Sequence, residues 1–267
     1  MQAEFLLRRE LNNNLVCVKQ RNTKFYPHFH SHIEIYLVIS GEFEVLINDR
    51  RKKLRSGELS VAFSYDVHSY NSPNDTEVYC LIIPPIYFDE FLPLLSSKHE
   101  GSPFIDDRQT YETVKKAMER LMEATNAISK QGYVYVILGE ILNKMPIIAD
   151  TETPDMRFSS DILIYVSQHF REELTLPMLA ARFGYNPSYL SRNFHNTFGI
   201  SFGKYLTMLR LREAVLLLHK NEMNITDCAL ESGFGSLRSF YRAFRDEFDC
   251  SPKEYLNRER QKPCHEK

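Results

Sequence analysis

The sequence predicts an α+β protein of two domains, a small β-barrel followed by an all-helical domain. Residues 25–84 carry the short alternating apolar and polar runs of β-strands. Apolar residues take up helical spacing after Pro84-Pro85, and the C-terminal part of the chain repeats itself at an offset of 49 to 50 residues. A length of 267 residues allows each domain its own core.

The predicted strands are short and separated by turns, which is typical of sandwiches and small barrels. Their patterns run over residues 30–37, 43–47, 59–63 and 78–83. No helix-length amphipathic pattern interrupts them. We therefore expect a β-barrel domain over residues 1–85.

Helical spacing after the barrel predicts helices over residues 86–95, 111–128 and 133–145. They lie in a region, residues 86–149, that would pack on the barrel or pair two subunits. The polar, proline-containing residues 150–158 are predicted to be a linker. Residues 159–262 show helical patterns without a strand signal and form the predicted second domain.

The composition narrows the class of protein. The apolar runs fall far short of the roughly 20 residues needed to cross a bilayer, and the first residues lack the pattern of a secretory signal, so a cytoplasmic protein is expected. The five cysteines include no C-x-x-C pair, which favours reduced thiols over disulfides or a zinc site.

The net charge of −2 does not by itself indicate nucleic-acid binding. From residue 158 onward the chain carries 15 lysines and arginines against 13 acidic residues, a surplus of only two. Any DNA-binding surface must therefore consist of local arginine patches.

The internal repeat is the most informative feature of the sequence. Ala180 and Gly184 recur 49 residues later as Ala229 and Gly233. Six further matches have an offset of 50, which places one extra residue in the second turn: Arg192, Phe194, Phe198, Ser201, Tyr205 and Leu206 recur as Arg242, Phe244, Phe248, Ser251, Tyr255 and Leu256. A small residue where two helices touch, followed by a glycine that ends the first helix, predicts two helix-turn-helix units.

The second helix of each unit must bury one face and leave the other exposed. An exposed arginine is usually only a solvated side chain, but the paired motif favours DNA binding. Arginine donates two hydrogen bonds to guanine or pairs with phosphate, and apolar side chains can contact a thymine methyl group. The candidate contacts are Ser188, Ser191 and Arg192 in the first unit and Leu237, Arg238, Tyr241 and Arg242 in the second.

Between the two units, residues 202–219 continue one amphipathic helical pattern. A helix of this length spans roughly 27 Å at about 1.5 Å per residue. We expect it to hold the two DNA-reading helices about one duplex turn apart, roughly 34 Å, so that one chain occupies two successive major grooves.

These residues resemble the AraC family of transcription regulators over residues 160–260. The matching segments are 179–194 and 198–202 in the first unit and 229–244 and 251–255 in the second. The resemblance implies that the seven candidate contacts meet base edges or phosphates. Leu237 stands where the family commonly has a polar residue, which puts hydrogen-bonded readout at this position in doubt.

A second pattern lies in the barrel. His28, His30, His32, Glu34 and Tyr36 alternate and would project from one face of a strand, while His68 and Tyr70 follow later. The pattern resembles the cupin barrel, whose motifs correspond here to His28, His30, Glu34 and Gly41 and to Gly57 and His68. This resemblance implies a jelly roll.

Three uses of these side chains remain open. They could bind Fe, Mn, Ni or Zn, as in metal-dependent cupin enzymes, or they could only make hydrogen bonds within the barrel. The resemblance to AraC-type regulators favours a third use, which is binding of a small effector, for example a sugar, without a required metal or cofactor. The effector would contact His28, His30, Glu34, Tyr36, His68 and Tyr70, with Phe43, Val45 and Phe63 as apolar walls. The other parity, Ile33, Ile35, Leu37 and Ile39, could equally face the interior.

The sequence thus predicts a regulator that binds double-stranded DNA and responds to a small effector, with activation favoured over repression. The effector would prefer one sensor conformation and so change DNA occupancy or contact with RNA polymerase. The helical region after the barrel would form a homodimer. The alternative is a metal-dependent cupin enzyme with an accessory helical domain.

Overall fold

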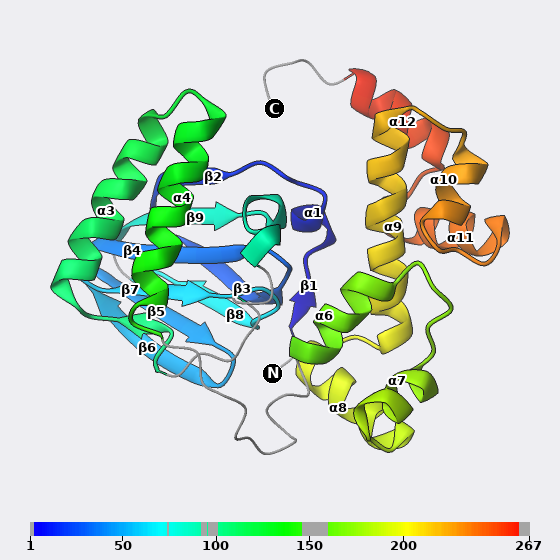
Figure 1. The fold of residues 1–267 in the computed structure, drawn as a ribbon, viewed down its shortest axis with the longest axis horizontal. Coiled ribbons are helices and arrows are strands. Elements are labelled where there is room, and N and C mark those ends of the chain that lie inside the picture. The colour runs from blue at the N-terminus through cyan, green and yellow to red at the C-terminus, as the bar shows by residue number, and fades with distance from the viewer. Residues whose placement is uncertain (1–2, 74, 92–94, 96–100, 146–159, 262–267) are drawn as a thin grey trace. The chain divides into compact units, whose positions relative to one another are not determined.

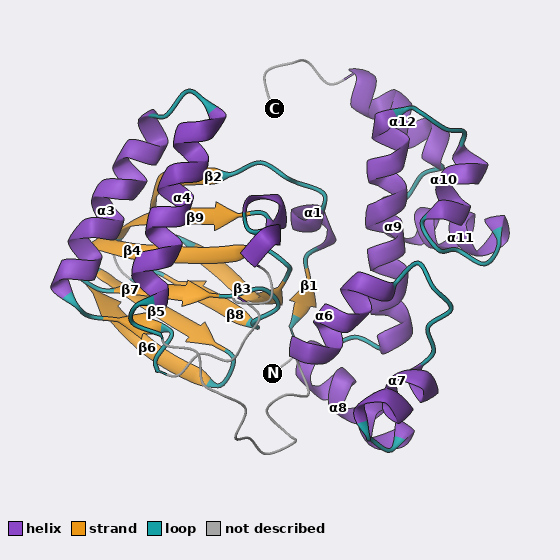
Figure 2. Ribbon diagram, in the orientation of Figure 1, coloured by secondary structure: helices purple, strands orange, loops and turns teal. Residues whose placement is uncertain are grey.

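The computed structural model describes residues 3–73, 75–91, 95, 101–145 and 160–261. The chain divides into two compact units near residue 161. All strands of the described residues lie in the first unit, and the described part of the second unit is helical (Figures 1 and 2). The predicted linker, residues 150–158, lies outside the described residues.

The first unit is a barrel of two five-stranded sheets, as the sequence predicts. One sheet has the order β1-β3-β8-β5-β6 and the other the order β10-β7-β4-β9-β2. Apart from the parallel pair β1 and β3, neighbouring strands are antiparallel. The strands are β1 Glu4–Phe5, β2 Val16–Arg21, β3 Lys24–Phe29, β4 Ile33–Ser40, β5 Glu42–Ile47, β6 Arg50–Arg55, β7 Leu59–Ala62, β8 His68–Asn71, β9 Glu77–Ile83 and β10 Phe104–Ile105.

Besides β1, β3, β8 and β10, the alternation patterns also missed the strands β2 and β6. Both are sheet edges, and β6 carries the basic sequence Arg-Arg-Lys-Lys-Leu-Arg. Charged side chains are common on edge strands because they discourage pairing with another chain. The same charges hide the apolar alternation by which strands are recognised.

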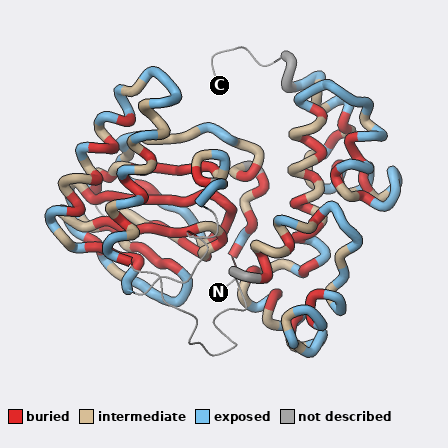
Figure 3. Tube along the Cα trace, in the orientation of Figure 1, coloured by how far each residue is buried: buried red, intermediate tan, exposed pale blue. Residues whose placement is uncertain are grey.

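Both faces of β4 are buried, which answers the question of parity. Tyr36 and Val38 point between the two sheets, into a core shared with β5, β8 and β9. Ile33, Ile35 and Leu37 point to the outer face of the same sheet, where two helices cover them (Figures 1 and 3). The even-numbered side chains of β4 are therefore the barrel interior.

The covering helices are α3, Arg108–Glu123, and α4, Ala127–Leu142. The predicted helix over 111–128 is wrong at its end, because the chain leaves the helical conformation at residues 124–126. The Asn126 side chain accepts a hydrogen bond from the Ser129 amide at 2.8 Å and begins α4 there. Apolar spacing continues across this break, so periodicity alone did not reveal it.

The predicted helix over 86–95 is also corrected. Residues 85–91 form two 3-10 turns, η1 Pro85–Tyr87 and η2 Asp89–Phe91, and residues 92–94 lie outside the described residues. The amides of Phe88 and Phe91 each bond to a carbonyl three residues back, at 2.8 and 2.9 Å. A short helix, α1 Leu7–Glu10, lies between β1 and β2.

The second unit contains seven described helices. They are α6 Ser160–His169, α7 Leu176–Phe183, α8 Pro187–Phe198, α9 Phe202–Lys220, α10 Ile225–Glu231, α11 Leu237–Phe248 and α12 Pro252–Gln261. The pairs α7 with α8 and α10 with α11 are the two predicted helix-turn-helix units, and α9 is the predicted connecting helix (Figure 1). Among the helices that the structure describes, none is both long and apolar enough to cross a bilayer.

The turns of the two units differ as the repeat predicts. Gly184 and Gly233 both have positive φ, +72° and +89°, and each follows the first helix of its unit. The second helix begins three residues after Gly184 but four residues after Gly233. The extra residue confirms the change of offset from 49 to 50.

Candidate nucleic-acid interface and sensor site

The inner faces of α8 and α11 hold these helices on their unit. Leu190 and Phe194 of α8 are fully buried, as are Phe240 and Phe244 of α11. The Phe194 ring lies 5.9 Å from the ring of Tyr205 on α9. In the second unit the Phe244 ring lies 5.6 Å from that of Tyr255 on α12. Repeated aromatic contacts thus fix the orientation of both helices.

The connecting helix α9 is also tied to the start of the unit. The guanidinium group of Arg210 donates hydrogen bonds to the carbonyl oxygens of Phe170 and Glu172, at 2.8 and 2.9 Å. These carbonyls follow α6, so Arg210 bridges two segments 38 and 40 residues apart. Such charge-assisted bonds favour one arrangement of the two helices.

All seven predicted DNA contacts lie exposed on the outer faces of α8 and α11. The seven are Ser188, Ser191, Arg192, Leu237, Arg238, Tyr241 and Arg242. Leu237 and Tyr241 are 36% and 42% exposed, although each belongs to a helix whose other face forms a core. Two large apolar side chains are thus partly exposed beside the arginines of α11.

The structure adds two exposed residues to these faces. His195 follows Ser191 by four residues on α8, and Arg245 follows Tyr241 by four on α11. Residues four apart lie on one helix face. This four-residue spacing is the sequence signal that identifies both residues, which lie one turn beyond the predicted contacts.

The histidine pattern of the barrel does not occupy a single strand, contrary to expectation. Strand β3 ends at Phe29 and β4 begins at Ile33, and the two strands belong to different sheets. Residues 30–32 therefore form a corner where the chain passes from one sheet to the other. The strict alternation of side chains is lost there, because it holds only within an extended strand.

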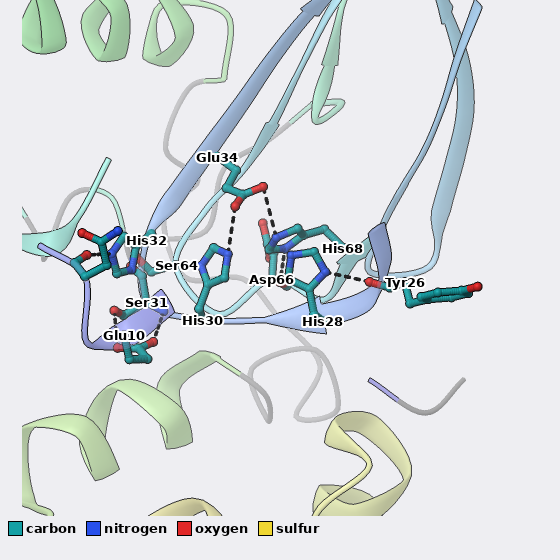
Figure 4. Close-up of polar contacts among 11 residues, drawn as sticks. Glu10, Tyr26, His28, His30, Ser31, His32, Glu34, Ser64, Asp66 and His68 are labelled. Carbon is teal, nitrogen blue, oxygen red and sulfur yellow. Dashed lines mark hydrogen bonds and ion pairs between the residues drawn. The ribbon is translucent and has the colours of Figure 1, made fainter. Parts of the chain in front are cut away.

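Four of the predicted effector residues converge next to this corner (Figure 4). Each of His28, His30, Glu34 and His68 offers one ligand atom, and these four atoms lie within 4.8 Å of one another. His30 Nε2 is 3.1 Å from Glu34 Oε1, and His68 Nε2 is 3.6 Å from Glu34 Oε2. All four side chains are buried. Strand pairing brings His28 directly opposite His68.

His32 leaves this cluster although it continues the alternation. Its Nε2 atom lies 2.8 Å from the carbonyl oxygen of Asn12, on the side away from Glu34 (Figure 4). Nearby, the Glu10 carboxylate accepts hydrogen bonds from the backbone amide and the hydroxyl of Ser31, the latter at 2.8 Å. The N-terminal segment is thus fastened to the corner that carries the histidines.

Burial sets the charge states in the cluster. Burial lowers the pKa of His68 to about 3 and also lowers the pKa of His28. Burial alone would raise the pKa of Glu34, but the hydrogen bond with His30 and the surrounding imidazoles outweigh it and hold this pKa below its ordinary value. At neutral pH, His28 and His68 are neutral beside an ionised carboxylate.

The aromatic members of the predicted site fill the space beside the cluster. The rings of Tyr36 and Tyr70 lie 4.2 Å apart, and Phe43 stacks on Tyr70 at 5.7 Å. Val45 belongs to the same core, so two of the predicted apolar walls do face the interior. The third, Phe63, is corrected, because it packs in the outer core under the helices α3 and α4.

The fold and these two sites define a class of protein, a β-barrel ligand-binding domain joined to a double helix-turn-helix domain. Comparison with known families agrees: the AraC-like ligand binding domain matches residues 12–138 and a helix-turn-helix domain matches residues 179–258. The chain belongs to the AraC family of transcription regulators. Because the members of this family are transcription regulators, the alternative prediction of a metal-dependent cupin enzyme is wrong.

Sequence identity to individual relatives is low. The chain is 27% identical over 244 residues to the HTH-type transcriptional activator RhaS of Klebsiella pneumoniae, covering 86% of this chain and 87% of that protein. It is 24% identical over 272 residues to an uncharacterized HTH-type transcriptional regulator of Staphylococcus aureus, covering 96% of this chain. The chain spans about a third of the length of that relative, 34%. A crystal structure of ToxT from Vibrio cholerae is 14% identical with a TM-score of 0.44, over 91% of this chain and 98% of that one.

Proposed function

We propose that this chain binds a specific duplex DNA sequence with α8 and α11 and regulates transcription in response to a small molecule bound in the barrel. The observation that carries the proposal is the pair of exposed faces on α8 and α11, each presented by a helix-turn-helix unit and joined by α9. The 19 residues of α9 span about 28 Å at about 1.5 Å per residue. That length suits two recognition helices about one duplex turn apart.

The exposed side chains suit the two kinds of DNA contact. Arg192, Arg238 and Arg242 can donate to guanine or to phosphate, and Leu237 and Tyr241 offer apolar surface to thymine methyl groups. Ser188 lies at the N-terminal end of α8, where the positive end of the helix dipole also favours phosphate. The binding is thus assigned to local side chains, in keeping with the small positive surplus of this domain.

In the barrel, the effector would contact His28, His30, Glu34, Tyr36, His68 and Tyr70. Few polar groups on an apolar wall are typical of a small-molecule site, and sugars are the first class to test. An effector that prefers one barrel conformation would shift DNA occupancy or the contact with RNA polymerase. Activation is favoured because similarity extends to the activator RhaS over most of both chains. Such a regulator acts in the cytoplasm, where bacterial DNA lies.

Selection from a random duplex library, with the purified full chain, tests the DNA-binding proposal. We expect enrichment of a sequence with two half-sites whose centres lie roughly 10–10.5 base pairs apart. Methylation of guanine N7 should interfere with binding in two successive major grooves on one face of the duplex. No enrichment, or protection of one groove only, would contradict the proposal. Footprints repeated with a panel of sugars then test the sensor.

We also propose that two chains pair through α4. Its outer face carries Ile128 and Val136, 86% and 47% exposed, in line with Gly132 and Gly139, around which the space is open. Spacings of four, four and three residues place all four on one stripe. The opposite face of α4 is already buried in the outer core, so this stripe is the surface left for a second copy.

Val136→Glu should weaken this dimer, because a charge buried in an apolar interface loses its hydration. We expect the dimer dissociation constant to rise by about tenfold or more, measured by sedimentation velocity of the full chain. Lys116→Glu, at an exposed position of α3, is the control and should leave self-association unchanged. Equal effects of the two substitutions would contradict the assignment of the interface.

A further inference from the structure

The cluster of His28, His30, Glu34 and His68 contains an arrangement of polar atoms that hydrogen bonds within the barrel do not satisfy. His68 Nε2 and His30 Nδ1 are buried and have no hydrogen-bond partner. His68 Nε2 nevertheless lies 3.6 Å from Glu34 Oε2. A buried polar atom without a partner costs free energy, so its place beside a carboxylate needs a physical reason.

The tautomers of the imidazole rings explain why His68 Nε2 and Glu34 Oε2 do not form a hydrogen bond with each other. His28 Nδ1 lies 2.7 Å from the carbonyl oxygen of Tyr26, and His68 Nδ1 lies 2.7 Å from that of Asp66 (Figure 4). A carbonyl oxygen only accepts, so Nδ1 carries the proton in both rings. In a neutral imidazole Nε2 then bears a lone pair. His68 Nε2 and Glu34 Oε2 are therefore two acceptors that face each other in the barrel interior.

We propose that a divalent first-row transition-metal ion binds between His28, His30, His68 and Glu34. A cation would satisfy the Nε2 lone pairs of His28 and His68 and the Glu34 carboxylate. His30 would join them through Nε2 once the proton that it now donates to Glu34 Oε1 moves to Nδ1. The backbone carbonyls that receive the Nδ1 protons are the outer-shell partners that orient metal-binding imidazoles. The inference deepens the proposed sensor role of the same barrel interior and is independent of DNA binding.

The spacing of the four side chains fits one ion after a small contraction. Ligand atoms bound at about 2.1 Å to one ion lie at most about 4.2 Å apart. The four ligand atoms already lie within 4.8 Å of one another. Three imidazoles and one carboxylate suit zinc, cobalt, nickel or iron, whereas calcium and magnesium prefer oxygen ligands throughout.

The ion would connect the two sheets of the barrel. His28 on β3 and His68 on β8 belong to one sheet, while Glu34 on β4 belongs to the other. His30 lies in the corner between them. The N-terminal strand β1 pairs with β3 at His28, so metal binding would also reach the segment that is fastened to this corner.

The test uses the full chain, stripped with a chelator and titrated with Co²⁺. We expect a visible d–d absorption band that saturates near one equivalent per chain, and one zinc per chain by mass spectrometry after Zn²⁺ loading. Saturating Zn²⁺ should raise the Tm of the barrel by roughly 5–10 °C, because the ion binds only the folded state. Glu34→Gln, which keeps the shape of the side chain, and His68→Ala should both abolish the band.

His32→Gln is the matched control, since His32 is buried and shares the alternation but contacts Asn12. It should keep one cobalt per chain. A folded wild-type chain that takes up no cobalt or zinc overturns the inference, as does full metal uptake by both Glu34→Gln and His68→Ala. Neither outcome touches the proposed DNA binding, which the library selection tests separately.

Discussion

Gly233→Ala is expected to destabilise the second unit by roughly 3 kcal/mol, whereas the equivalent Gly184→Ala should cost only about 1 kcal/mol. Both glycines have positive φ, so a side chain at either position meets the same left-handed penalty. Only at Gly233 would the new Cβ atom lie 2.6 Å from Arg171 Cα and 2.9 Å from the Arg171 carbonyl oxygen. Those are backbone atoms, which cannot rotate away.

Hydrogen exchange of the α10 and α11 amides in the full chain measures this difference, because exchange reports the free energy of local opening. It also avoids the two-state assumption that a chain with two units does not satisfy. For Gly184→Ala the relevant amides are those of α7 and α8. Equal losses of protection in the two variants would show that the close approach to Arg171 is not what requires a glycine.

Arg242→Ala is expected to weaken binding to the selected duplex by about 1–3 kcal/mol, which corresponds to roughly 5- to 150-fold in Kd. If Arg242 reads a base, discrimination at one position of the site should also relax. If it contacts phosphate, affinity should fall evenly across sequences and the salt dependence should decrease by about one ion. Fluorescence anisotropy at several salt concentrations separates the two cases.

Arg120→Ala is the control for this measurement. Arg120 is an exposed arginine of α3 in the barrel unit, where it pairs with Glu123 at 3.2 Å, so its loss changes the net charge by the same amount. We expect less than a twofold change in Kd. If both variants bind the selected duplex with wild-type affinity, α11 does not contact DNA in the proposed way.

The helical domain could be predicted from the sequence in detail, because its information is local. A small residue, a glycine and a row of phenylalanines at four-residue spacing occur within about twenty residues of each other, and they occur twice. The offset change between Gly233 and Arg242 even indicated the longer second turn. What periodicity did not reveal was the break at residues 124–126, since it depends on the cap at Asn126 and not on the apolar pattern.

The sequence by itself indicated the four polar side chains of the barrel cluster, but only the tertiary structure decided how they meet. His28, His30 and His32 look equivalent in the sequence, yet two of them join Glu34 and the third turns to Asn12. The reason is that the chain changes sheets at residues 30–32, where alternation ends. The meeting of His28 with His68 depends on the register between β3 and β8, which pairing between distant segments sets and no local pattern encodes.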